Sequence, residues 1–200
     1  MTATESPSLA MSFELIRSRL HDPDFLAGNG LSNEVPFFVF AYDSAQENEV
    51  RELTAFLVAE HTGNEGPCRV TYFDLWDLFC ELCEDRGILA KLSSLEERRG
   101  SDALLERIHR MVGPEEYTAA MHRHCEERHG GLVPGKDVVL IGGVGKVHPF
   151  VRTHSILDNL QATFPGIPIV VLYPGIYDGQ TLRLFGSVGD GNYYRAFSLI

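Results

Sequence analysis

The sequence contains no long apolar run and carries little positive charge. No stretch of about 18 consecutive apolar residues occurs in its 200 residues, so we expect no membrane-spanning helix. Lysine and arginine number 17 against 28 aspartates and glutamates, which gives a formal net charge of -11. Nucleic-acid binders neutralise phosphates with clustered Lys and Arg, so this balance argues against direct nucleic-acid binding.

Cysteine is also scarce, and no secretion signal is apparent. The first seven residues lack the basic and apolar regions of a signal peptide, so we expect a cytoplasmic protein with reduced thiols. A zinc site is an alternative for the residues that could supply ligands, which are Cys80, Cys83, His122, His124, Cys125 and His129. Apolar neighbours surround the Cys80-x-x-Cys83 pair, and no second such pair exists. We therefore expect buried cysteines, with no metal and no cofactor.

The charge is unevenly distributed along the chain. Residues 1–80 carry 4 basic and 13 acidic groups, residues 81–141 carry 9 and 12, and residues 142–200 carry 4 and 3. The net charges of these segments are therefore -9, -3 and +1. The near-neutral third segment leaves room for a local binding site or a protein contact.

Apolar runs alternate with helical patterns, as in an α/β fold. We expect a Rossmann-like or P-loop-like, mostly parallel sheet flanked by helices. The predicted strands are 36–42, 69–74, 136–141 and 167–172, followed by candidate edge strands at 181–185 and 193–200. The predicted helices are 13–20, a helix capped by Asp43 or Ser44, 75–84 and 149–164.

One segment interrupts this alternation. Residues 86–128 are helical in character with mixed charges, and Gly113-Pro114 breaks them, since proline fits the first turn of a new helix. We expect a disordered leader over residues 1–11 and a single α/β domain over 12–200, with a helical excursion at about 86–130.

A glycine-rich turn follows the predicted strand 136–141. A P-loop requires Gly-x4-Gly-Lys-Ser/Thr, in which backbone N–H groups hold phosphate and the hydroxyl binds magnesium. Here Leu140 stands where the first glycine belongs, and Val147 replaces the hydroxyl residue. We interpret the segment as a tight strand-to-helix turn. Its alternative as a ligand site comprises Gly142, Gly143, Gly145, Lys146 and Arg152.

Aromatic residues gather after the predicted strand 167–172, at the sheet edge where sites form in doubly wound folds. They could belong to such a site, but aromatic-rich loops favour protein interfaces, so we predict a partner-binding surface. Its candidate residues are Tyr173, Tyr177, Asp178, Gln180, Tyr193, Tyr194 and Arg195.

The sequence resembles the BrxB family, whose members belong to bacterial BREX phage-defence systems. The resemblance extends over nearly the whole chain after the leader and rests on several segments. They are 39–43, 73–75, 87–89, 142–152, 174–180 and 192–197. It implies a small cytoplasmic protein encoded beside an ATPase, a DNA methyltransferase and the alkaline-phosphatase-like PglZ. No family catalytic residue carries over, so the resemblance indicates a pathway and no reaction.

These observations predict a non-catalytic adaptor of a BREX complex that binds PglZ or another BREX protein. The alternative is a nucleotide-binding or hydrolysing enzyme, with Lys146 and Arg152 on phosphate and Asp74 or Asp178 on a metal. Direct DNA binding by the arginines of the helical excursion is a third and weaker hypothesis, because nearby acids nearly cancel their charge.

Overall fold

Two compact units make up the chain in the computed structural model, which describes residues 8–28, 37–63, 65–151, 153–189 and 196–199. Unit 1 comprises Met1–Thr71, Val133–Leu140 and Gly166–Ile200, and unit 2 comprises Tyr72–Leu132 and Ile141–Pro165. The boundary between them falls within two strands, β2 (Arg69–Asp74) and β3 (Asp137–Gly142). The single domain expected over residues 12–200 stays a prediction.

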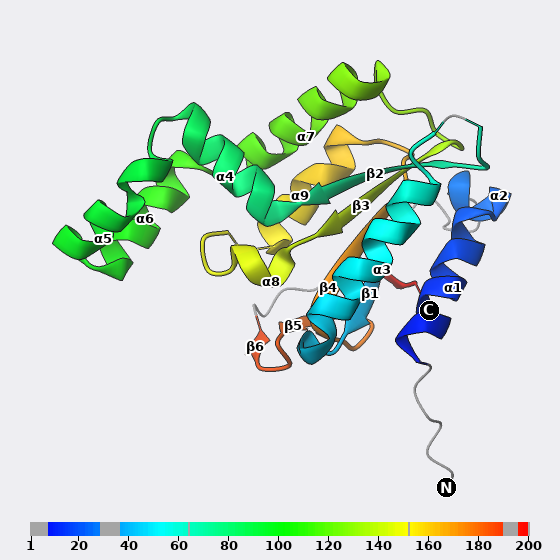
Figure 1. Ribbon diagram of the computed structural model, residues 1–200, viewed down its shortest axis with the longest axis horizontal. Helices are drawn as coiled ribbons and strands as arrows, with labels where there is room; N and C mark the ends of the chain where they lie inside the picture. The colour runs from blue at the N-terminus through cyan, green and yellow to red at the C-terminus, as the bar shows by residue number, and fades with distance from the viewer. Residues whose placement is uncertain (1–7, 29–36, 64, 152, 190–195, 200) are drawn as a thin grey trace, which may run out of the picture. The chain divides into compact units, whose positions relative to one another are not determined.

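The strands form a seven-stranded, mostly parallel sheet, which confirms the predicted α/β class (Figure 1). The order along its main path is β2-β3-β4-β1-β7. The remaining strand bounds are β1 Phe37–Tyr42, β4 Ile169–Tyr177, β5 Leu182–Leu184, β6 Val188–Gly189 and β7 Phe197–Ser198. β1 runs parallel to both of its neighbours, β4 and β7, whereas β5 pairs antiparallel with β4 and β6. Both faces of β1 are covered, which is why its sequence is a continuous apolar run.

The helices of unit 1 precede and follow β1. Their bounds are α1 Leu9–Leu20, α2 Pro23–Leu26, the 3-10 turn η1 Ser44–Gln46, and α3 Glu47–Glu60. α1 begins at Leu9, so residues 9–11 form its first turn and do not belong to the expected leader. The Ser8 hydroxyl caps this turn by accepting a hydrogen bond from the Met11 N–H at 3.3 Å. Asp43, one of the two residues expected to cap the helix after β1, caps the preceding turn η1 through the N–H of Ala45.

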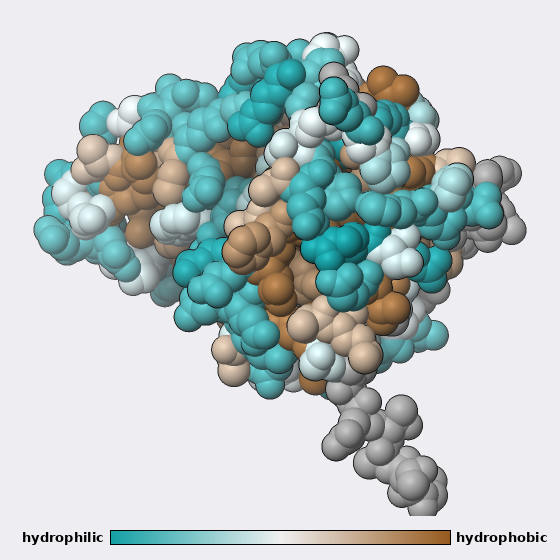
Figure 2. Space-filling view, turned by 45° about the vertical axis from the view of Figure 1, so that its right-hand side comes forward, coloured by the Kyte–Doolittle hydropathy of each residue, from teal (hydrophilic) through white to brown (hydrophobic). Residues whose placement is uncertain are grey.

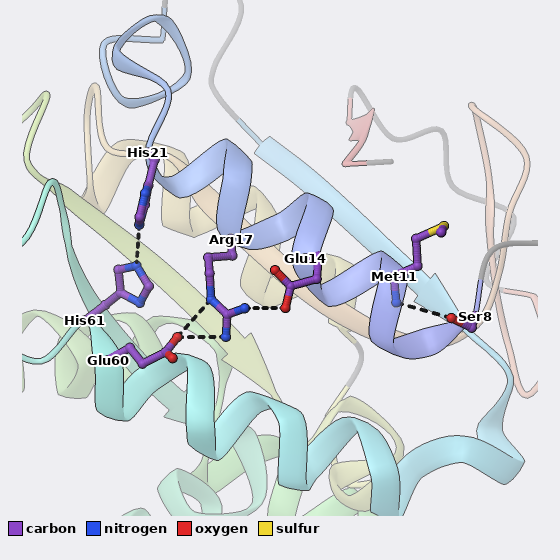
Figure 3. A network of polar contacts seen from close by, with 7 residues as sticks. All are labelled: Ser8, Met11, Glu14, Arg17, His21, Glu60 and His61. Carbon is purple, nitrogen blue, oxygen red and sulfur yellow. Dashed lines mark hydrogen bonds and ion pairs between the residues drawn. The ribbon is translucent and has the colours of Figure 1, made fainter.

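α1 and α3 run side by side and share a polar network (Figure 3). Arg17 of α1 reaches the Glu60 carboxylate of α3 at 2.8–2.9 Å. Beside this ion pair, the Nε2 atoms of His21 and His61 lie 3.3 Å apart. His61 is buried, and its Nδ1 lies 2.8 Å from the Leu57 carbonyl oxygen. These contacts fix the C-terminal ends of both helices in unit 1.

Unit 2 is mainly helical. Its element bounds are α4 Leu75–Asp85, the 3-10 turn η2 Leu89–Lys91, α5 Leu92–Arg99, α6 Ser101–Met111, α7 Pro114–His129, α8 Val144–Val147 and α9 Thr153–Thr163. α7 packs against both α4 and α9, and the Phe79 and Phe150 rings stack with centroids 4.9 Å apart. α7 begins at Pro114, as predicted, and the Gly113 N–H donates to the Glu116 carboxylate at 2.8 Å.

Two element predictions were wrong. The helix expected over 149–164 begins later, as α9 at Thr153, and a separate short helix, α8, forms before it at Val144–Val147. The strand expected to end at Leu172 continues to Tyr177, so Tyr173-Pro174-Gly175 lies within β4 and is not a turn. Gly175 makes this extension possible, because a Cβ there would clash with the Arg183 carbonyl and lie 3.1 Å from the Phe185 nitrogen.

Candidate functional site

The glycine turn after β3 packs tightly against the end of β2, within unit 2. Gly143 has φ +73°, and a Cβ on it would clash with the Asp74 carboxylate and lie 3.0 Å from the Leu75 nitrogen. A Cβ on Gly142 would lie 3.0 Å from Cε2 of the Tyr72 ring. The two glycines therefore allow a close approach between two strand ends.

Asp74 occupies the space beside this turn. Its Oδ1 accepts a hydrogen bond from the Trp76 N–H at 2.9 Å, so the side chain caps the start of α4. Its Oδ2 forms an ion pair with Nζ of Lys146 and accepts a longer contact from the Tyr72 hydroxyl at 3.4 Å. The Asp74 side chain is only 8% exposed, against 36% for Lys146. The lysine of the turn is therefore already paired with an anion of the protein itself.

The helix after the turn offers little to a phosphate. α8 has only four residues, so it provides no extended helix N-terminus for an anion. Gly145 is half-buried within α8, and Arg152 lies outside the described residues. Among the five predicted ligand residues, the structure places Gly143 and Lys146 against Asp74, and Gly142 against the Tyr72 ring.

The second predicted site lies in unit 1, where β4 continues into an antiparallel arm with β5 and β6. We call residues 175–189 the β4–β6 arm. Tyr173 is buried in β4 below this arm, whereas the half-buried Tyr177 donates its hydroxyl hydrogen to the Ala196 carbonyl at 2.6 Å. Tyr193, Tyr194 and Arg195, also predicted for this surface, lie outside the described residues.

Asp178 forms the turn of the β4–β6 arm. It accepts hydrogen bonds from the N–H groups of Gln180 and Thr181 at 3.0 and 2.7 Å, and from the Thr181 hydroxyl at 2.7 Å. These bonds to Thr181 and Gln180 lower the pKa of Asp178, with a small further contribution from Arg183. Gln180 is exposed on the same turn. Asp178 therefore fixes the shape of the turn.

Sequence reasoning missed three exposed apolar side chains on the same arm. Ile176, Phe185 and Val188 are 47%, 44% and 43% exposed. In the sequence, Ile176 resembles a core residue because it comes soon after an apolar run. It is exposed because β4 extends beyond the parallel part of the sheet. Phe185 has φ +54°, a left-handed backbone conformation that the sequence did not indicate for a phenylalanine.

The possible zinc ligands have other neighbours. Cys83 and Cys125 are buried, His124 lies 2.8 Å from the Glu81 carboxylate, and His122 stacks on the Phe164 ring. Within the described ranges, no group of three or more His, Cys, Asp or Glu residues could hold a metal ion. In the same part of the chain, every helix is too short or too polar to cross a membrane.

The family model described as BREX protein BrxB matches residues 71–199. A Bacillus cereus (strain H3081.97) protein named BREX protein BrxB is 36% identical over 185 residues, which cover 92% of this chain and 94% of that protein. An Escherichia coli O9:H4 (strain HS) protein of the same name is 26% identical over 194 residues, covering 97% and 92%. No solved structure matches the chain.

Proposed function

Because the chain belongs to the BrxB family of BREX phage-defence proteins, we propose that it is a non-catalytic adaptor that binds another BREX subunit, PglZ in particular. The family membership confirms the resemblance detected in the sequence and places the chain within the BREX system. The choice of an adaptor rests on the surface of unit 1.

The observation that carries this proposal is the exposed apolar surface of the β4–β6 arm. Ile176, Phe185 and Val188 are each more than two-fifths exposed, and all three lie within 13 consecutive residues. Apolar side chains that gather on a surface favour contact with another protein, because their burial releases water. The arm is also held in shape by Asp178, so a partner would bind a preformed surface at a small entropy cost.

The predicted polar members of the surface fit around these apolar residues. Gln180 is exposed beside Asp178, and Tyr177 presents a half-buried ring whose hydroxyl holds the segment before β7. Tyrosine and apolar side chains with a polar rim are typical of protein interfaces. We assign the contact to residues 176–188, with Tyr193, Tyr194 and Arg195 as further candidates.

The glycine turn supports an adaptor over the nucleotide-binding alternative. Lys146 is paired with Asp74, and the space beside Gly142 and Gly143 is filled by protein atoms. A phosphate would have to displace Asp74 from Lys146, and that carboxylate also caps α4.

Co-purification of the chain with each BREX subunit tests the proposal. We expect a stable complex with wild-type protein and loss of that complex in Ile176→Asp, which places a charge on the exposed apolar surface. Leu15→Asp is a matched control, because Leu15 is 45% exposed on α1 and therefore equally accessible. A complex that survives Ile176→Asp would refute the assigned surface, and failure of the wild-type chain to bind any BREX subunit would refute the adaptor function.

Thermal denaturation with ATP and magnesium tests the alternative. We expect no stabilisation by nucleotide. A stabilisation that disappears in Lys146→Ala would instead support a nucleotide-binding enzyme.

A further inference from the structure

A cavity opens between α5 and α6 at the end of the helical segment of unit 2. Its volume is about 340 Å³, and every residue that lines it belongs to unit 2. The floor is apolar and includes Leu92, Leu95, Ile108 and Met111. Apolar side chains framed by hydrophilic ones are visible over this part of the molecule in Figure 2. A cavity of this size accommodates a few apolar side chains.

α5 is not fully covered by the rest of the protein. None of its eight residues is buried, and Leu92 and Leu95 are only half-buried. Isolated helices shorter than about 12 residues are marginal in water, so α5 depends on packing against its neighbours. Its packing partners here are α6 and η2. The apolar side chains of α5 are therefore only partly covered by the rest of unit 2.

The rim of this cavity is positively charged. Four cations line it, and they are Lys91, Arg98, Arg99 and Arg107. In the part of the chain that the structure describes, none of the four has an ion pair, and Arg98 donates only to Ser94. No aspartate or glutamate is among the lining residues.

The acids of the same helices lie elsewhere. The segment also contains four carboxylates, which are Glu96, Glu97, Asp102 and Glu106, and none of them lines the cavity. Counting charges along the sequence suggested that acids nearly cancel the arginines. The fold separates the two signs, so that the cavity has an apolar floor and an unneutralised cationic rim.

We propose that this cavity binds an acidic amphipathic helix of a protein partner. Apolar side chains of that helix would fill the space above Leu95 and Ile108, and flanking carboxylates would pair with the cationic rim. Arginine and methionine are enriched at protein interfaces, and both line this cavity. The choice of a protein as occupant rests on the proposed adaptor function.

A protein helix fits better than duplex DNA. A DNA backbone presents phosphates over a long surface, and it would meet the carboxylates that lie outside the cavity on α5 and α6. The chain as a whole has a net charge of -11, which repels a long polyanion. A single helix contacts only the cavity and its rim.

A peptide assay with the full chain tests the chemistry of the cavity. The probe is a helix-forming peptide of about 18 residues with leucines at helical spacing and glutamates beside them. We expect this peptide to bind, binding to weaken with salt, and a peptide with the same composition but scrambled leucines to bind at least about tenfold more weakly. Equal binding of both peptides, or no binding up to about 1 mM, would overturn the proposal.

Charge reversal locates the binding. Arg107→Glu should weaken binding of the acidic peptide by about tenfold or more. Arg110 lies on the same helix but does not line the cavity, so Arg110→Glu should have little effect on binding. Circular dichroism of both variants checks that α6 is retained. Equal effects of the two reversals would contradict the proposal, as would tighter binding of a DNA duplex than of the acidic peptide.

Co-purification with BREX subunits then separates this proposal from the adaptor function. Loss of a subunit in Arg107→Glu but not in Arg110→Glu would support the cavity as a docking site. If the wild-type chain binds a subunit and Arg107→Glu binds it equally well, the adaptor stands and the cavity proposal fails. If the wild-type chain binds no subunit, the adaptor fails, and the peptide assay still decides what the cavity binds.

Discussion

Asp137→Asn should destabilise unit 1 strongly, because Asp137 is the buried anion that neutralises Arg69. The Asp137 side chain is 0% exposed and that of Arg69 is 10% exposed. The Arg69 Nε and Nη2 atoms donate to the two carboxylate oxygens at 2.6 and 2.8 Å. Oδ2 also accepts the Val133 N–H at 2.6 Å, so this carboxylate joins β2 to the turn before β3.

The size of the effect follows from the uncompensated charge. Removing one partner of a buried ion pair costs about 3–5 kcal/mol, a large part of the roughly 5–15 kcal/mol that stabilises a typical domain. For a chain of this length, that loss lowers the melting temperature by about 6–20 °C. Asn preserves the volume of the side chain, so the change reports charge and hydrogen bonding and leaves packing nearly unaltered.

Urea denaturation followed by circular dichroism measures this loss. Glu14→Gln is the matched control, since Glu14 is 69% exposed and its ion pair with Arg17 should contribute less than about 1 kcal/mol. Adding Arg69→Met to Asp137→Asn removes the guanidinium that has lost this carboxylate and should restore part of the stability. An Asp137→Asn protein as stable as Glu14→Gln would refute the reasoning.

Three further predictions concern the close packing at Gly143, the hydrogen bond of Tyr177, and the buried thiols of Cys68 and Cys83. Gly143→Ala should lower the free energy of unfolding by at least about 2 kcal/mol, and by more than Gly87→Ala does. Both glycines have positive φ, but of the two only Gly143 would bring a Cβ against other atoms. Urea denaturation of both variants checks this difference. Tyr177→Phe removes a 2.6 Å hydrogen bond to the Ala196 carbonyl before β7, so amide hydrogen exchange at β7 should accelerate. Unchanged exchange would contradict the idea that this bond holds β7 in place. Burial raises the pKa of Cys68 and Cys83 to about 11, so native protein at pH 8 should resist thiol reagents at both positions until it unfolds. The resulting contribution to stability is complete below pH 9 and is lost as the pH rises toward 11, which pH-dependent denaturation would detect.

The sequence correctly predicted the elements that are determined by a local residue pattern. The strand over 69–74 and the start of α7 at Pro114 were located correctly, because an apolar run and a Gly-Pro break are local signals. The extension of β4 was missed, because Pro174-Gly175 reads as a turn. In the structure Gly175 pairs with Leu184 of β5, and the close approach of the Arg183 carbonyl leaves no room for a side chain there.

The candidate sites depended more on long-range contacts. Lys146 and Asp74 lie 72 positions apart, so no motif spacing could have paired them. The charges of α5 and α6 alternate along the chain, and only the helical geometry places the cations together at one cavity. Tyr177, Asp178 and Gln180 of the predicted partner-binding surface lie on the β4–β6 arm, and the exposure of Ile176 and Phe185 on the same arm needed the structure.

The pairing of Asp74 with Lys146 has a consequence for how this turn could change over evolution. A carboxylate tethered to the same fold acts as an anion at high effective concentration, so a dissolved phosphate must compete with it at the lysine. Replacing Asp74 by alanine would free the lysine but would also remove the cap of α4 and leave Gly143 beside an empty space. The same carboxylate therefore both starts α4 and occupies the lysine, and a substitution that releases Lys146 without losing the cap must keep a capping oxygen, as Asn or Ser would.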